Sequence, residues 1–321
     1  LFGSIFPIGA MIGPIFGGLF VSWWTWRAAF LVNVPIGIIV ILLTLRYIPR
    51  DPSRRKRASS GIDAPGMLLL SGGLLAGMLA VTHLGGTKTS MWSAGFAVPL
   101  AIALVAAWAF FRHIGRASHP FVAPHLIYGP DFGTVNLVNM VFSGVTIGVV
   151  ALIPLYAANR YGIGALNAGA LLIAEGAAAI IMSVVVALVL RRTGHRLPIF
   201  SGAVVIAVGT VLLALPPRFG VTPYAWLAAS AFVIGAGMGT INPASRNAGL
   251  QLAPRQASTL AALRTLSLQI GSIATISITT AILAGSADPG SIQAWVYIVA
   301  ALLIVAALPV ISRVPEHHGS W

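Results

Sequence analysis

The chain has no cysteine and very little charge among its 321 residues. The missing cysteines exclude disulfide bonds and thiol chemistry within these residues. Charged residues make up only 8% of the sequence, against about 25% in soluble domains. Acidic residues are the scarcest, with Asp and Glu together numbering 6, whereas hydrophobic residues reach 58%. This composition excludes an ordinary soluble domain and indicates a membrane protein.

Apolar runs of about twenty residues, the length that a helix needs to cross a bilayer, recur along the chain. We therefore expect an all-α polytopic membrane protein with about ten transmembrane helices. The expected helices span residues 2–22, 28–48, 64–83, 93–112, 132–157, 165–190, 197–215, 223–244, 259–284 and 292–312.

The net charge of +13 is a topology signal. If the first helix runs outward from the cytoplasm, the cytoplasmic ends of the helices hold all but four of the 19 basic residues. Those four are Arg27, Lys88, Arg160 and Arg218. Such a bias follows the positive-inside rule and predicts a multi-pass protein of the cytoplasmic (inner) membrane with a cytoplasmic C-terminus. No basic face or base-stacking module accompanies the charge, so we expect no nucleic-acid partner.

The first expected helix contains Gly9, Gly13, Pro14, Gly17 and Gly18. In a soluble helix each glycine costs about 1 kcal/mol and an interior proline about 3 kcal/mol. In lipid, small residues four apart allow two helix backbones to approach closely. This run resembles the antiporter motif G-x-x-x-G-P-x-x-G-G of the major facilitator superfamily, which lies on the fifth helix of that family.

A second signature follows, with Trp26, Arg27, Asn33 and Pro35 inside the stretch WRAAFLVNVPIG. It is similar to the start of helix six in the fourteen-helix drug:proton antiporters. The resemblance covers nearly the whole chain and implies a multidrug exporter, a secondary active transporter rather than an enzyme. Its partners would be the lipid bilayer, amphipathic small-molecule substrates and protons. It implies no cofactor and no metal, because the proton gradient supplies the energy.

On this resemblance the chain starts at the fifth helix, so four helices of the same protein would precede it. Either the sequence is a fragment of a longer protein, or the gene is broken and its product is a non-functional remnant. The implied divisions are 1–48 (last two helices of the N-terminal bundle), 49–63 (basic cytoplasmic linker), 64–113 (two extra central helices), 114–130 (cytoplasmic loop), 131–313 (C-terminal six-helix bundle) and 314–321 (cytoplasmic tail).

Glu175 is the one carboxylate near the middle of an expected helix. Leaving it charged in hydrocarbon is costly, so we expect it to face a cavity or a partner. Two roles are open. It binds protons or cationic substrates during transport, or it is a neutral acid that is hydrogen-bonded between helices.

Arg264 lies about one turn inside its expected helix, in a stretch similar to the arginine-bearing start of the family's helix thirteen. It either extends to the cytoplasmic surface or forms a gate ion pair. Gln269, five residues further on, is a candidate for lining the cavity. Asn136 and Asn139 share one helix face, which predicts either a cavity lining or hydrogen bonds between helices.

Two further patterns concern helix packing. The run Gly235–Gly239, which ends at Asn242–Pro243, predicts close helix packing or a hinge. Residues 187–196 resemble the superfamily's short loop motif G-x-x-x-D-R-x-G-x-R, but Arg191 stands where the motif has its acid. The charge latch of that motif is therefore not expected here.

Other functions stay open. An exporter of a specific metabolite or siderophore would carry the same two motifs. A polytopic membrane enzyme would need clustered His, Asp or Glu, whereas His83 and His113 each stand alone near helix ends. A channel would need a selectivity-filter pattern, which the sequence lacks.

Overall fold

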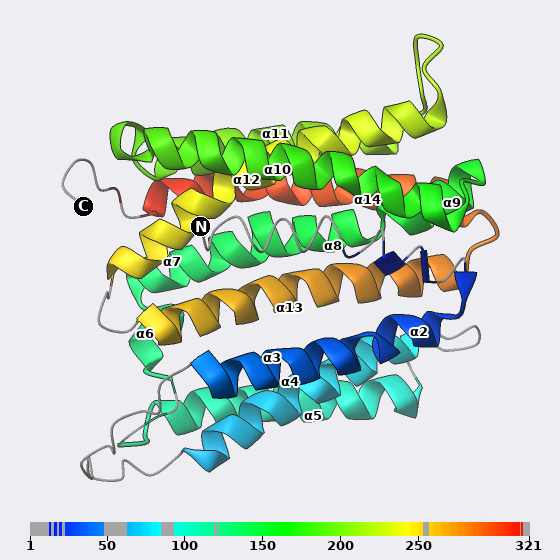
Figure 1. Cartoon of the computed structure of the whole chain (residues 1–321). Helices are drawn as coiled ribbons and strands as arrows, with labels where there is room; N and C mark the ends of the chain where they lie inside the picture. Colours follow the sequence, from blue (N-terminus) through cyan, green and yellow to red (C-terminus); the bar gives the residue numbers. More distant parts are fainter. Residues whose placement is uncertain are drawn as a thin grey trace.

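The computed structural model describes residues 13, 16–17, 19–20, 23–47, 63–84, 93–118, 120, 122–252, 257–314 and 316. All regular structure in these ranges is helical (Figure 1), which confirms the expected all-α membrane bundle. The helices are α2 (Trp26–Leu31), α3 (Asn33–Tyr47), α4 (Ala64–Leu84), α5 (Ala94–Ile114), α6 (Pro124–Tyr128), α7 (Pro130–Val138), η1 (Asn139–Val145), α8 (Thr146–Ala151), α9 (Ile153–Tyr161), α10 (Ala165–Thr193), α11 (Arg196–Ala214), α12 (Pro223–Leu252), α13 (Ala257–Ala284), α14 (Pro289–Ala307) and η3 (Leu308–Arg313).

Eight helical segments within the described ranges are long and apolar enough to cross a membrane. They match the expected helices from 64–83 onward to within a few residues, with two exceptions: the span Asp131–Ala151 ends six residues before the expected end at 157, and α12 continues to Leu252. The expected helix 28–48 is found as α2 and α3, of which α3 has 15 residues. The expected helix 2–22 lies mostly outside the described residues.

The helices form layers (Figure 1). Helices α10, α11, α12 and α14 lie together at one side, and the segment α7 to α8 runs beneath them. Helix α13 lies between this group and the α4–α5 hairpin, and it packs against η1, α8 and α4. The turn between α10 and α11, α6 and the C-terminal segment gather at one end of the bundle, which we call the α6 end.

Glycines let the helix backbones touch. A methyl group added at Gly235 or Gly239 of α12 would overlap the carbonyl oxygen of Glu175 or Ala179 on α10. On another face of α12, a methyl group at Gly237 would lie 2.6 Å from the carbonyl oxygen of Gly202 on α11. The close packing predicted for Gly235–Gly239 is therefore confirmed, and α12 is held between α10 and α11.

The expected uninterrupted helix 132–157 is wrong in detail. Residues 139–145 form a π-helix, and the axis breaks at Leu152, just before Pro154. The wider π turn brings Gly144 against α13, where an added methyl group would lie 3.0 Å from the Cα of Gly271. Pro154 has no N–H to continue the α-helical bonding, which explains the break.

The α4–α5 hairpin is tied at the α6 end. The Nε2 atom of His113, near the end of α5, lies 2.6 Å from the Oδ1 atom of Asp63, just before α4. The same carboxylate accepts the backbone N–H of Gly66 at 2.9 Å, so it also caps α4. The expectation that His113 stands alone is therefore wrong, because the fold brings in a partner 50 residues away.

Candidate functional site

Glu175 lies on the α12-facing side of α10 and is 9% exposed. Its backbone carbonyl contacts Gly235. Within the described ranges its side chain forms no hydrogen bond and no ion pair. An unpaired carboxyl group in an apolar bundle is costly in either protonation state, and the charged form is the costlier of the two. The two roles open to Glu175 both stay predictions.

Arg264 reaches from α13 to α12, where its Nη2 atom donates to Oδ1 of Asn242 at 2.9 Å. Its Nε atom is buried and has no hydrogen-bond partner in the part of the chain described. The like charge of Arg246 on α12 also acts on it. Among the described residues Arg264 thus bonds a neutral amide rather than a carboxylate, and the gate ion pair stays a prediction.

Asn136 and Asn139 use their amide groups differently. Asn136 donates to the carbonyls of Leu126 at 2.9 Å and Ile127 at 3.2 Å, and so fixes α6 against α7. Asn139 donates to Val135 of its own helix, while its buried Oδ1 atom has no partner within the described residues. Both amides donate to backbone carbonyls, the amide of Asn136 to those of a neighbouring helix, and the two alternatives of cavity lining and hydrogen bonding between helices stay predictions.

Gln269 is exposed near the middle of α13. Its Oε1 atom accepts a long hydrogen bond from the hydroxyl of Ser272 at 3.4 Å. Thr265, one turn earlier, is also exposed. The exposed large residues of α14, such as Leu302, are by contrast apolar and suit lipid. An amide is costly to bury in hydrocarbon, so this face of α13 suits water or protein.

The glycine-rich motif is described only in part. Gly13 and Gly17 lie in helical turns, and a methyl group added at either would meet no described atom within 4 Å. Gly9, Pro14 and Gly18 lie outside the described residues. The contact expected between this helix and another bundle therefore stays a prediction.

The second signature falls at the junction of α2 and α3. Trp26 and Arg27 belong to the first turn of α2, whereas Asn33 and Pro35 open α3. The side chains of Arg27, Asn33 and Pro35 are exposed. Proline is tolerated in the first turn of a helix because the N–H it lacks would be unpaired there anyway. The stretch therefore covers the starts of both α2 and α3, and its role as a family signature stays a prediction.

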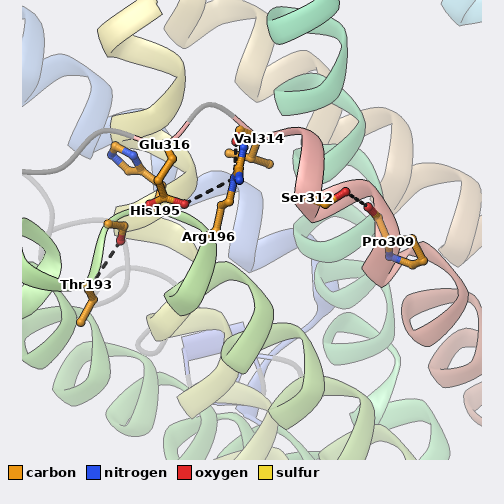
Figure 2. Close-up of polar contacts among 8 residues, drawn as sticks. Thr193, His195, Arg196, Pro309, Ser312, Val314 and Glu316 are labelled. Carbon is orange, nitrogen blue, oxygen red and sulfur yellow. Dashed lines mark hydrogen bonds and ion pairs between the residues drawn. The ribbon is translucent and has the colours of Figure 1, made fainter.

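The loop between α10 and α11 receives a carboxylate from the far end of the chain (Figure 2). Oε1 of Glu316 accepts the backbone N–H of His195 at 2.8 Å, and Oε2 lies 3.4 Å from Nε of Arg196. Nε of Arg196 also donates to the carbonyl of Val314 at 2.7 Å, and Val314 is fully buried. The loop lacks its own acid at Arg191, yet the C-terminal segment supplies one.

A buried polar cluster at the opposite end of the bundle was missed from the sequence. Nε2 of Gln293 on α14 donates to the carbonyl of Leu152 at 3.0 Å and to the hydroxyl of Tyr297 at 2.9 Å. The rings of Tyr156 and Tyr297 meet edge to face, with centroids 5.2 Å apart. The four-residue spacing of Gln293 and Tyr297, which places both polar side chains on one helix face, could have indicated this cluster from the sequence. The cluster holds α14 against the break before α9.

Helix α12 contacts both of the helices that carry Glu175 and Arg264. Glu175 contacts it at Gly235 and Arg264 contacts it at Asn242, so the two residues approach the same helix from α10 and α13. They form no ion pair with each other. Long apolar helices that enclose a few polar groups between them define a multi-pass integral membrane protein.

Sequence comparison gives the particular family. The chain matches the Major Facilitator Superfamily model over residues 1–276 and belongs to that family. The family is one of transporters rather than enzymes.

Several proteins to which the chain is similar are named as efflux or resistance proteins. The Multidrug transporter protein MdtP of Bacillus subtilis is 26% identical over 76% of this chain and 44% of its own length. The Drug efflux pump JefA of Mycobacterium tuberculosis is 30% identical over 73% of this chain and 45% of its own. The Methylenomycin A resistance protein of Streptomyces coelicolor is 28% identical over 90% and 59%. The chain thus spans about half the length of the curated relatives it matches.

Proposed function

We propose that the chain is part of a proton-coupled multidrug efflux transporter, a drug:proton antiporter of the fourteen-helix type in the cytoplasmic membrane. The names of the relatives support export of drugs. The observation that supports proton coupling is the burial of Glu175, whose carboxyl group has no cationic partner among the described residues. The basic residues at the cytoplasmic helix ends support a cytoplasmic C-terminus.

In this proposal Glu175 is neutral when it holds a proton and carries a charge after the proton leaves. The charged form attracts a cationic substrate and is disfavoured by the apolar surroundings. Whether a proton or a substrate is bound at Glu175 therefore biases the arrangement of α10 and α12. The energy source is the proton gradient, without a cofactor. The exposed polar face of α13 at Gln269 would meet the aqueous pathway, which further helices of the same protein, the N-terminal ones, would complete.

The test uses the full-length protein in lipid vesicles with an acidic interior and ethidium, a cationic amphipathic dye, outside. An antiporter lets protons leave and ethidium accumulate, and dissipating the gradient stops the uptake. Glu175→Gln should reduce the gradient-driven uptake at least tenfold. Asp131→Asn, a change at an exposed acid of α7, is the matched control and should keep the uptake.

The possible failures are distinguishable. If the unmodified protein takes up no ethidium under a gradient, the multidrug proposal is wrong and an exporter of a specific metabolite or siderophore is favoured. If uptake occurs and Glu175→Gln matches the unmodified protein, the transporter remains and the role of Glu175 is lost. Uptake that is insensitive to the gradient would refute proton coupling alone.

A further inference from the structure

Helix α12 contains a proline in its interior. Pro243 has no N–H, so it cannot donate to the carbonyl of Gly239, four residues earlier, as a helical residue would. A carbonyl without a donor is strongly disfavoured at membrane depth, and a side chain from a neighbouring helix can supply one. In the structure the hydroxyl of Ser183 on α10 donates to the carbonyl of Gly239 at 3.2 Å.

The hydroxyl reaches this carbonyl because the two backbones are in contact there. Gly239 has no side chain, and a methyl group at its position would overlap the carbonyl oxygen of Ala179, one turn before Ser183. Gly235, one turn earlier on α12, contacts α10 in the same way. The part of α12 that precedes the proline is therefore fixed to α10 along two consecutive turns.

The segment that follows, residues 243–252, is held differently. Its buried side chains at Ala244 and Ala248 are small, and a methyl group at Gly249 would meet only the side chain of Val135, at 3.4 Å. Asn242, the residue just before the proline, accepts the hydrogen bond from Arg264 of α13. Figure 1 shows this segment descending toward α6 and α7. It is held by side chains, whereas the preceding turns are held by backbone contact.

We propose that α12 is jointed at Pro243, that residues 243–252 take two positions relative to α10, and that Ser183 and the Asn242–Arg264 bond hold the position seen here. Ser183 is a positioning residue, because it supplies the donor that Pro243 lacks. The inference goes beyond the proposed function and does not depend on the substrate or on proton coupling, since it concerns hydrogen bonds within the bundle. Prolines are the usual cause of helix bends, and helix-terminal residues often serve as hinges.

The test measures distance between two spin labels in the full-length protein. The labels are attached through Arg192→Cys at the end of α10 and Arg246→Cys in the first turn after the proline, both exposed positions. The 321 residues of this chain contain no cysteine, and any cysteine elsewhere in the full-length protein is replaced by serine first. The unmodified background should give two distances. Pro243→Ala restores the missing donor and should leave one.

Ser183→Ala should change the ratio of the two populations by about threefold to tenfold, the effect of one hydrogen bond. Ser183→Thr, which keeps the hydroxyl, should restore the original ratio. Ser183→Ala should have no further effect in the Pro243→Ala background, because Gly239 then has its own helical donor. Matched controls are Pro99→Ala, inside α5, and Ser201→Ala, whose hydroxyl bonds within α11.

A single distance in the unmodified background, or an unchanged distribution in Pro243→Ala, would overturn the joint. An equal effect of Ser183→Ala in both backgrounds would overturn the link between Ser183 and Pro243. Neither result depends on transport. A protein that fails to move ethidium yet shows the joint would refute only the proposed function.

Discussion

Replacing Gly235 by alanine tests the contact on which the candidate site is built. The added methyl group would overlap the carbonyl oxygen of Glu175 and lie 2.7 Å from its carbonyl carbon. Carbon atoms pack favourably at about 3.5–4.0 Å, so α10 and α12 must separate by about 1 Å. The neighbouring atoms belong to the backbone and cannot rotate away. The 3.2 Å hydrogen bond from Ser183 to Gly239 would lengthen beyond the useful range.

The magnitude follows from three contributions. Overpacking costs about 1–3 kcal/mol, and loss of the hydrogen bond costs about 1 kcal/mol. The higher helix propensity of alanine returns about 1 kcal/mol. The net destabilisation is therefore about 1–3 kcal/mol. Gly72→Ala in α4 is the matched control, because a methyl group there meets no described atom within 4 Å and only the propensity gain remains.

The assay is thermal unfolding of the purified protein in detergent, followed by tryptophan fluorescence. At about 2–4 °C per kcal/mol, Gly235→Ala should lower the unfolding temperature by about 5 °C. Gly72→Ala should leave it unchanged or raise it slightly. Equal unfolding temperatures for the two variants would refute the inference that backbone contact at Gly235 stabilises the bundle.

Two further predictions concern the ends of the bundle. Glu316→Ala removes the acceptor of the His195 N–H, a loss of about 1 kcal/mol that should lower the unfolding temperature by about 2–4 °C. The exposed ion pair with Arg196 adds little to this effect. An unchanged unfolding temperature would contradict the role of the C-terminal segment. Hydrogen bonds from the hydroxyl and the N–H of Ser291 hold the pKa of Asp288 below its ordinary value of 3.8. The stabilisation from Asp288 is therefore present above pH 3.8 and is lost as the pH falls through the lowered pKa. Asp288→Asn should make the unfolding temperature less dependent on pH on the acid side. Parallel pH profiles for the two proteins would contradict this prediction.

The spans were predictable because the bilayer imposes a simple length and composition on each one. The expected helix ends differ from the observed ones where a contact between helices overrides the local sequence preference. Pro243 predicts a helix end near residue 244, yet α12 continues to Leu252 because Ser183 on another helix replaces the missing donor. The close packing at Gly235–Gly239 was predictable, since glycines spaced four apart have few other uses in a membrane helix.

The site was less predictable than the spans. Glu175 could be recognised from its rarity, but its neighbours could not, because they come from a helix 60 residues away. The carboxylate of Glu316 reaches a loop 121 residues earlier in the chain, and no local pattern indicates that pairing. The π-helix at Asn139–Val145 also has no sequence signal, because it depends on the packing of Gly144 against Gly271.

Helix α12 joins the chemistry of Glu175 to the joint at Pro243. Where side chains separate two helices, rotamer changes absorb small displacements, but α10 and α12 meet through backbone at Gly235 and Gly239. A displacement of α10 at Glu175 is therefore expected to move α12 as well. Pro243, which lacks one helical hydrogen bond, lies one turn beyond Gly239. The proton-binding candidate and the joint are thus two turns apart on one rigid contact, and a change at either should alter the other.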